Sequence, residues 1–121
     1  MDTFKLTIED TKNRPVSRTL HTANIYKKEM YIYGGIERSN RILSTMHKYD
    51  IERKEWTLVL KTDFSTFNHT STIHKEKMYL FGGFGMIGDE IDTELNNLFE
   101  YDFNTNKLKE IIYTGTVPSP R

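Results

Sequence analysis

The chain has 121 residues, enough for one domain of ordinary size, so a multi-domain organisation is excluded. Seventeen Lys and Arg residues balance seventeen Asp and Glu residues, and this neutral charge excludes a protein drawn to nucleic acid or an anionic membrane by its overall field. There is no Cys, which excludes disulfides and thiolate metal sites and favours a reducing, cytoplasmic location. No apolar run approaches twenty residues and no signal peptide is recognisable, so the protein is expected to be soluble and without a membrane partner.

Short segments with the pattern of β-strands follow one another through the first half of the chain. Residues 4–8 alternate apolar and polar side chains, which predicts a strand. Four more strands are predicted after it, at residues 22–26, 30–33, 45–50 and 56–60. The polar stretch 27–29 has the length of a hairpin turn, and Gly34 and Gly35 end the strand that follows it.

The second half of the chain repeats this order. Strands are predicted at residues 70–74, 78–81, 98–102 and 108–113, with Gly82 and Gly83 after the second of them. The segments before the two glycine pairs, 30–33 and 78–81, are apolar at every position, which predicts strands covered on both faces.

The two halves are copies of one unit. Residues 21–35 align with residues 69–83 at a shift of 48 positions, and eight of these fifteen positions are identical. The second copy has four extra residues between its glycine pair and Tyr101, compared with the stretch before Tyr49 in the first copy. Four short strands in a unit of about 50 residues are typical of a β-propeller blade.

The two copies share a His, a strand ended by a glycine pair, a Tyr-Asp pair, and a large apolar residue seven positions after the Tyr. With these features the sequence of each copy resembles the kelch repeat, which forms propeller blades. The resemblance is most specific at Gly34, Gly35, Tyr49, Trp56, Gly82, Gly83, Tyr101 and Leu108. Leu108 stands where the family usually has Trp, which predicts weaker packing there. The resemblance implies an all-β, kelch-type β-propeller fragment of two four-stranded antiparallel blades plus a leading outer strand.

On this interpretation residues 1–121 form one partial kelch propeller. Residues 1–17 would supply the leading outer strand and a connection, residues 18–65 the first kelch repeat, and residues 66–121 the second repeat and the start of the next connection. Propellers have about 4–8 blades, so two blades cannot close a ring. Further blades are therefore expected from the same longer chain or by oligomerisation, and the end of the sequence within a connection favours a fragment.

Motifs that would indicate an enzyme are weak. Gly83, Gly85 and Gly88 have the G-x-G-x-x-G spacing of a dinucleotide-binding loop, but an acidic run, residues 89–94, follows where a phosphate would bind. That run lacks the spacing of a calcium loop. We therefore predict no catalytic residue, no metal and no cofactor, and expect that the protein is not an enzyme.

His21 and His69 occupy the same position in the two copies. A residue that recurs at one repeat position is expected to serve the structure of the blade. Both side chains are therefore predicted to be packed and hydrogen-bonded rather than catalytic.

The expected function is non-catalytic protein binding, as a scaffold or adaptor. The resemblance implies that inter-blade connections and the loops between second and third strands share one face that holds partner proteins or peptides. Candidate partner-binding residues on this face are Arg18, Arg38, Asn40, Arg41, Met86, Asp89, Glu90, Asp92 and Arg121. The Arg side chains suit a partner carboxylate or phosphate, and the acidic loop suits a basic segment.

Other interpretations stay open. In one of them, the charged side chains of the candidate binding face pair with one another on a solvent-exposed rim, and the repeated Arg is a structural part of each connection. Alternatively, the chain belongs to a propeller enzyme or small-ligand-binding protein whose active residues lie in absent blades, or it is a truncated product without function.

Overall fold

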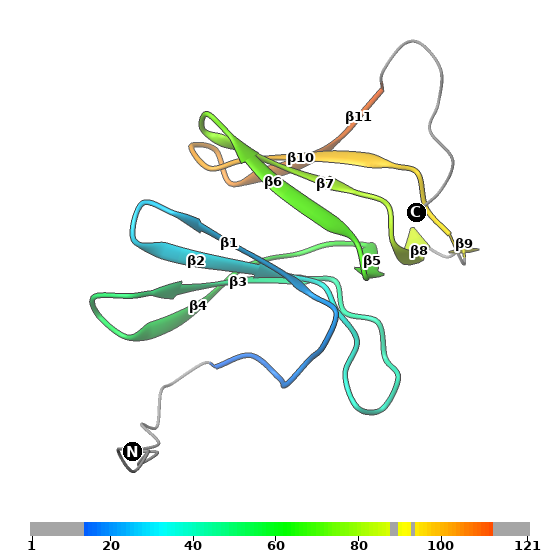
Figure 1. Ribbon diagram of the computed structural model, residues 1–121, viewed down its shortest axis with the longest axis horizontal. Helices are drawn as coiled ribbons and strands as arrows, with labels where there is room; N and C mark the ends of the chain where they lie inside the picture. Colours follow the sequence, from blue (N-terminus) through cyan, green and yellow to red (C-terminus); the bar gives the residue numbers. More distant parts are fainter. Residues whose placement is uncertain (1–13, 88–89, 93, 113–121) are drawn as a thin grey trace, which may run out of the picture.

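The computed structural model describes residues 14–87, 90–92 and 94–112, and within these residues the chain forms strands and no helix (Figure 1). The strands assemble into two four-stranded sheets and one three-stranded sheet. This architecture confirms the all-β, kelch-type propeller fragment predicted from the sequence, and its sheets do not close into a ring. The leading strand expected at residues 4–8 lies outside the described residues.

Each copy of the repeat forms one four-stranded antiparallel sheet. The first blade contains β1 (Thr22–Tyr26), β2 (Glu29–Tyr33), β3 (Thr45–Asp50) and β4 (Glu55–Lys61), in this spatial order. The second blade contains β6 (Thr70–His74), β7 (Lys77–Phe81), β10 (Leu98–Asp102) and β11 (Lys107–Ile111), again in this order. The four strands predicted in each copy therefore all form, with ends shifted by at most two residues wherever the structure describes them.

The hairpin between β1 and β2 has a polar turn without glycine. Lys27 and Lys28 both have left-handed backbone angles, with φ of 50° and 64°. Two residues with positive φ form the turn whose twist matches that of an antiparallel pair. The turn therefore fixes the register in which Tyr26 lies opposite Glu29.

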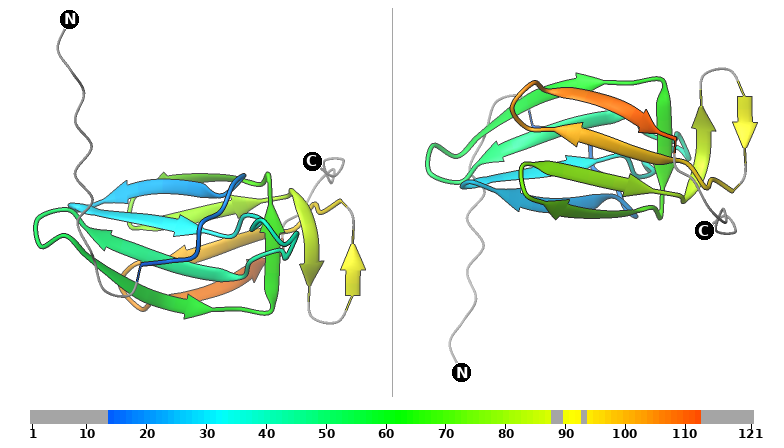
Figure 2. Two further views of the ribbon diagram at one scale, coloured as in Figure 1. Left: turned by 90° about the horizontal axis from the view of Figure 1, so that it is seen from below. Right: turned by 90° about the horizontal axis from the view of Figure 1, so that it is seen from above.

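A third sheet was not predicted. It contains β5 (Phe64–Phe67), β8 (Phe84–Ile87) and β9 (Glu90–Asp92), in the order β5-β8-β9. It is formed by the connection between the blades and by the long loop between β7 and β10, at one end of both blades (Figure 2). The alternative of a dinucleotide-binding turn is not met in the described part of this loop, because Gly85 lies within β8 and faces Thr66 across a strand pair.

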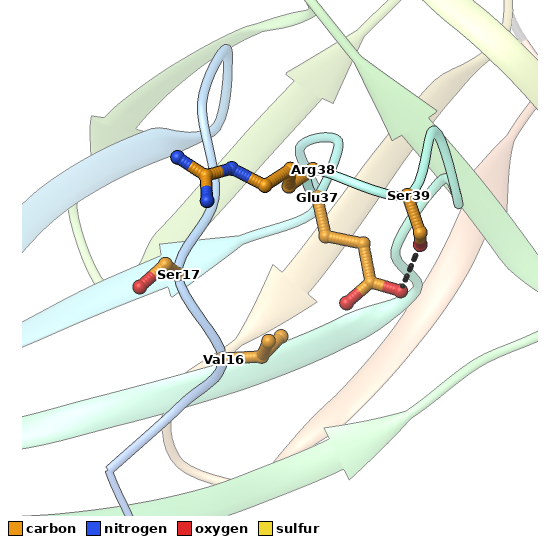
Figure 3. Close-up of a pocket in the computed structure, with 5 residues that line it drawn as sticks. All are labelled: Val16, Ser17, Glu37, Arg38 and Ser39. Atoms are coloured by element: carbon orange, nitrogen blue, oxygen red, sulfur yellow. Dashed lines mark hydrogen bonds between the residues drawn. The ribbon is translucent and has the colours of Figure 1, made fainter.

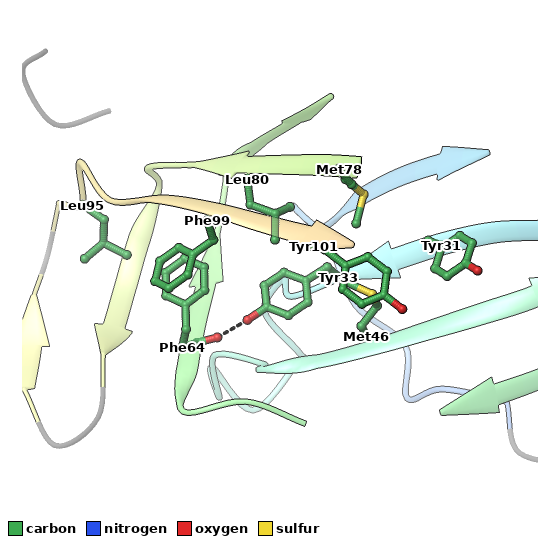
Figure 4. Close-up of a cluster of buried hydrophobic side chains, with 9 residues drawn as sticks. All are labelled: Tyr31, Tyr33, Met46, Phe64, Met78, Leu80, Leu95, Phe99 and Tyr101. Atoms are coloured by element: carbon green, nitrogen blue, oxygen red, sulfur yellow. Dashed lines mark hydrogen bonds between the residues drawn. The ribbon is translucent and has the colours of Figure 1, made fainter. Parts of the chain in front are cut away.

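The hydrophobic core lies between the two blades (Figure 4). It consists of Tyr31, Tyr33, Met46, Phe64, Met78, Leu80, Leu95, Phe99 and Tyr101. The hydroxyl group of buried Tyr33 donates a hydrogen bond to the carbonyl oxygen of Phe64 and lies 2.9 Å from the Thr62 hydroxyl. Five of the nine core residues are aromatic, and the three tyrosines among them carry a hydroxyl group that can form a hydrogen bond.

The prediction of strands covered on both faces is correct for β2 and only half correct for β7. Residues 31–33 of β2 are all buried. In β7, Met78 and Leu80 are buried, whereas Tyr79 and Phe81 are only partly buried. Tyr79 and Phe81 lie on the face of the second blade that points away from the first blade, and no other described sheet covers that face.

Candidate functional site

The loops expected to carry the function lie together at one end of the blades. This end contains the segment before β1, the loop between β2 and β3, and the three-stranded sheet (Figures 1 and 2). The hairpin turns that join β1 to β2 and β6 to β7 lie at the opposite end. The expectation that inter-blade connections and loops between second and third strands share a face agrees with this arrangement.

A groove opens between residues 16–19 and the loop between β2 and β3, and we call it the first-repeat groove. Its larger hollow has a volume of about 630 Å³ and is lined by Val16, Ser17, Glu37, Arg38 and Ser39 (Figure 3). A second hollow of about 440 Å³ adjoins it and is lined by Ser17, Arg18, Thr19, Ile36, Glu37, Arg38 and Asn40.

Comparison of the two copies explains why this groove exists. In the second copy the corresponding segments pair with each other as β5 and β8 over four residues. This pairing requires Gly85, because a Cβ atom there would overlap the backbone carbonyl oxygen of Ser65. At a shift of 48 positions the first copy has Glu37, and the segments form only the single bridge between Thr19 and Ile36 before they separate.

Local hydrogen bonds hold the loop that forms one wall of the groove. The Glu37 carboxylate accepts a hydrogen bond from the Ser39 hydroxyl at 2.9 Å and pairs with Nε of Arg41 at 2.8 Å. Asn40 has a left-handed backbone, with φ of 68°, and its backbone N–H donates a hydrogen bond to the Glu37 carbonyl oxygen at 2.9 Å. The loop is therefore a closed turn that projects the exposed Arg38 side chain beside the groove.

Arg38 differs from the other arginines of this face. Within the described part of the chain its guanidinium has no hydrogen bond and no ion pair, whereas Arg41 is paired with Glu37. Its five N–H groups are therefore available to a ligand.

Arg18 has a structural role in the blade. Its guanidinium donates to the carbonyl oxygens of Val16 and Gly34, at 3.2 and 3.1 Å. Burial lowers the pKa of Arg18, and the charge of Glu37 partly opposes this effect. The counterpart of Arg18 in the second copy is Thr66, whose hydroxyl donates to the carbonyl oxygen of Gly82 at 3.1 Å. The same position thus caps the first glycine of the pair in both copies, which supports the alternative that Arg18 belongs to the connection.

The candidate residues of the second copy are only partly described. Met86 lies in β8 and pairs with Ser65 on one side and Ile91 on the other. Glu90 and Asp92 lie on β9, the edge strand of the small sheet. Asp89 and Arg121 lie outside the described residues. The structure therefore places Arg18, Arg38 and Asn40 in the lining of one groove, whereas Arg41 is paired with Glu37, which also lines it.

The two repeated histidines have different environments. His69 is 7% exposed, and its Nε2 lies 2.8 Å from the Thr22 hydroxyl of the other blade. Burial lowers the pKa of His69 to about 4, with a smaller contribution from His21. The prediction of a packed, hydrogen-bonded histidine is correct for His69. It is wrong for His21, which is exposed because no neighbouring blade covers it among the described residues.

Two further features are absent from the described residues. No group of three or more His, Asp or Glu side chains is placed to hold a metal ion in this part of the chain. None of the described segments is a helix long and apolar enough to cross a membrane.

Two antiparallel four-stranded sheets that pack face to face, with β1 beside β6 and a connection at one end, are consecutive blades of a β-propeller. The family that matches the chain is described as the KLHDC2/KLHL20/DRC7 Kelch-repeats domain, and the match covers residues 1–121. The chain belongs to this kelch-repeat family. No curated protein matches it. Kelch-repeat domains generally serve as scaffolds for protein–protein interactions.

Proposed function

We propose that the chain is a non-catalytic protein-binding module and that a partner protein or peptide binds in the first-repeat groove. The observation that carries this proposal is an open groove with an exposed arginine, Arg38, that has no partner among the described residues. The groove lies beside the loop between β2 and β3, whose backbone is hydrogen-bonded to the blade, and binding residues are often carried by loops on such a scaffold.

The chemistry of the groove favours a carboxylate on the partner. Arg38 can offer two parallel N–H donors to one carboxylate, the strongest geometry available to an ion pair on a protein surface. The nearby Glu37 carboxylate is already paired with Arg41 and repels a second acid placed on its side of the loop. A bound segment would therefore place its acidic residue beside Arg38 and a neutral residue beside Glu37.

Arg41 contributes less than Arg38 in this proposal. Its ion pair with Glu37 is short, at 2.8 Å, but the Arg41 side chain is 69% exposed, so the pair is weak. An incoming carboxylate would have to compete with Glu37 for it. We expect removal of the Arg41 side chain to weaken binding by a smaller factor than removal of the Arg38 side chain.

The test uses a linear peptide selected from a displayed library against the 121-residue chain, labelled and titrated by fluorescence anisotropy. Arg38→Ala is expected to weaken its binding about tenfold or more, and Arg38→Lys to weaken it less, because Lys keeps the charge and loses the paired donors. Arg53→Ala is the matched control, since Arg53 lies in the turn between β3 and β4 at the other end of the blade. Equal loss for Arg38→Ala and Arg53→Ala, or no loss for either, would contradict the site.

A further inference from the structure

The face of the first blade that points away from the second blade is apolar, and no described sheet packs on it, although Ile32 within it is only 6% exposed. Its side chains share one face because they lie opposite one another across all four strands: Ala23, Ile25, Met30, Ile32, His47, Tyr49, Trp56 and Leu58. Ile25 is 65% exposed and Leu58 is 53% exposed. None of these residues is an acid, a lysine or an arginine. We call this set the first-blade free face.

The counterparts of these residues in the second blade form the contact between the blades. Ile25, Met30 and Ile32 correspond to Ile73, Met78 and Leu80, while Tyr49 and Trp56 correspond to Tyr101 and Leu108. Met78, Leu80 and Tyr101 are at most 1% exposed, and Ile73 and Leu108 pack against the same core. The first-blade free face therefore has the composition of a face that a neighbouring blade covers.

The turn after β3 contains another exposed apolar residue whose counterpart in the second copy is covered by a blade. Ile51 is 45% exposed, whereas its counterpart Phe103 stacks on the Tyr26 ring of the first blade, with ring centres 3.8 Å apart. The exposure of Ile51 is thus explained by the lack of a described blade on that side.

The outer face of the second blade offers the matching surface. It presents Thr70, Thr72, Tyr79, Phe81 and Leu98, which correspond to Thr22, Asn24, Tyr31, Tyr33 and Met46, the residues with which the first blade contacts the second. We call this set the second-blade free face. The Glu100 carboxylate on this face is paired, because Nζ atoms of Lys77 and Lys109 lie 3.3 and 3.8 Å from one of its oxygens.

A hydrogen bond joins the two blades, and the residues that correspond to its two partners do not bond each other within the described chain. Thr22 of the first blade bonds His69 of the second at 2.8 Å. The corresponding residues are Thr70 on the second-blade free face and His21 beside the first-blade free face. The exposed His21 ring has no hydrogen bond within the part of the chain that the structure describes. Thr70 and His21 are thus placed to form the same bond across a contact between two chains.

We propose that the first-blade free face of one copy binds the second-blade free face of another copy, head to tail. This contact repeats the geometry that already joins the two blades within one chain. A head-to-tail contact between identical subunits closes into a ring when the rotation per copy allows it. Because propellers have about 4–8 blades, two to four copies would complete one.

The test begins with the mass of the full chain in solution, measured by light scattering over a concentration series. A discrete oligomer of two to four copies is expected. Ile25→Glu and Phe81→Glu each place a charge in one of the two faces and are expected to give monomers with unchanged circular dichroism. Ile112→Glu is the matched control: Ile112 is 86% exposed, follows β11 and belongs to neither free face. It is expected to leave the oligomer intact.

A mixture of the two monomeric variants then tests the head-to-tail arrangement. Ile25→Glu chains keep the second-blade free face and Phe81→Glu chains keep the first-blade free face, so the mixture is expected to form a one-to-one complex. Self-association of either variant alone would show that a face binds its own copy and would overturn the proposal. A monomeric wild-type chain at the highest concentration, or an aggregate unaffected by both substitutions, would overturn it as well.

Discussion

The two copies of the repeat differ most in the segment that follows the glycine pair. In the second copy this segment pairs with the inter-blade connection as β8 and β5, with Gly85 facing Thr66. In the first copy Glu37 takes the place of Gly85, the pairing stops after Ile36, and a groove of about 630 Å³ remains. We expect this one position, which has no Cβ atom in the second copy, to decide between a closed sheet and an open groove.

Other counterpart positions show that a place in the repeat does not by itself fix burial. His69 is buried between the blades and His21 is exposed. Thr66 is fully buried and Arg18 only partly. In both pairs the buried member belongs to the second copy, since its connection and inner face pack against the first blade. The neighbouring blade therefore sets the environment of each repeat position.

Among the substitutions that test the difference between the two copies, Gly85→Ala is expected to lower the free energy of unfolding most. The added Cβ would overlap the Ser65 carbonyl oxygen, a backbone atom that cannot move aside without breaking the β5–β8 pair. We expect a loss of about 3 kcal/mol in the free energy of unfolding, measured by urea denaturation. Amide hydrogen exchange at residues 65–67 should become faster.

The matched change in the first copy is Glu37→Ala. It removes an ion pair whose Arg41 partner is exposed and creates no overlap, so we expect a loss of less than about 1 kcal/mol. Equal losses for Gly85→Ala and Glu37→Ala would show that the missing Cβ is not what closes the second copy.

The different environments of His69 and His21 predict that the free energy of unfolding depends on pH, with an effect smaller than that of Gly85→Ala. Burial lowers the pKa of His69 to about 4, below the value of about 6.5 expected in the unfolded chain. The unfolded state therefore binds a proton first as the pH falls, and the stability due to neutral His69 is present above pH 6.5 and lost between about pH 6.5 and 4. At about 1.4 kcal/mol per pKa unit, we expect a loss of about 2 kcal/mol between pH 7 and 4.5.

Denaturation of two variants over this pH range checks the assignment. His69→Gln is expected to flatten the pH dependence. His21→Gln is expected to keep most of it, because His21 is exposed and its pKa is lowered less by burial. The opposite ranking of the two variants would assign the dependence to the first copy.

The sequence predicts the blades well because their signals are local. Glycine pairs, a hairpin-length polar turn and a 48-residue shift are sufficient to place β1 to β4 and their counterparts. The recurring pattern also leads to the kelch family, which the match over residues 1–121 bears out. These features need no knowledge of which blade lies beside which.

The groove and the third sheet could not be predicted, since they depend on contacts between distant segments. Nothing in the sequence near Gly85 shows that Ser65 lies directly against it, and the glycine spacing there resembles a nucleotide-binding loop equally well. The available Arg38 and the engaged Arg18 have the same side chain, and only the position of the Gly34 carbonyl separates them.

A smaller effect separates the structural arginine from the proposed binding arginine. Arg18→Met keeps the aliphatic stem and loses the bonds to the Val16 and Gly34 carbonyls, so we expect a loss of about 1 kcal/mol in the free energy of unfolding. Thr66→Val, the counterpart change in the second copy, should cost a similar amount because it leaves the buried Gly82 carbonyl without its hydroxyl donor.

Peptide affinity gives the reverse order for Arg18 and Arg38. Arg18→Met is expected to leave the affinity for the selected peptide unchanged, because its guanidinium is bound to its own blade. Arg38→Ala is expected to lose affinity with no change in urea denaturation, because the Arg38 side chain has no partner among the described residues. Arg18 lines the second hollow of the groove. Loss of both stability and affinity in Arg18→Met would therefore show that Arg18 also contacts the peptide, and the two copies would then differ in function at the position that caps the glycine pair.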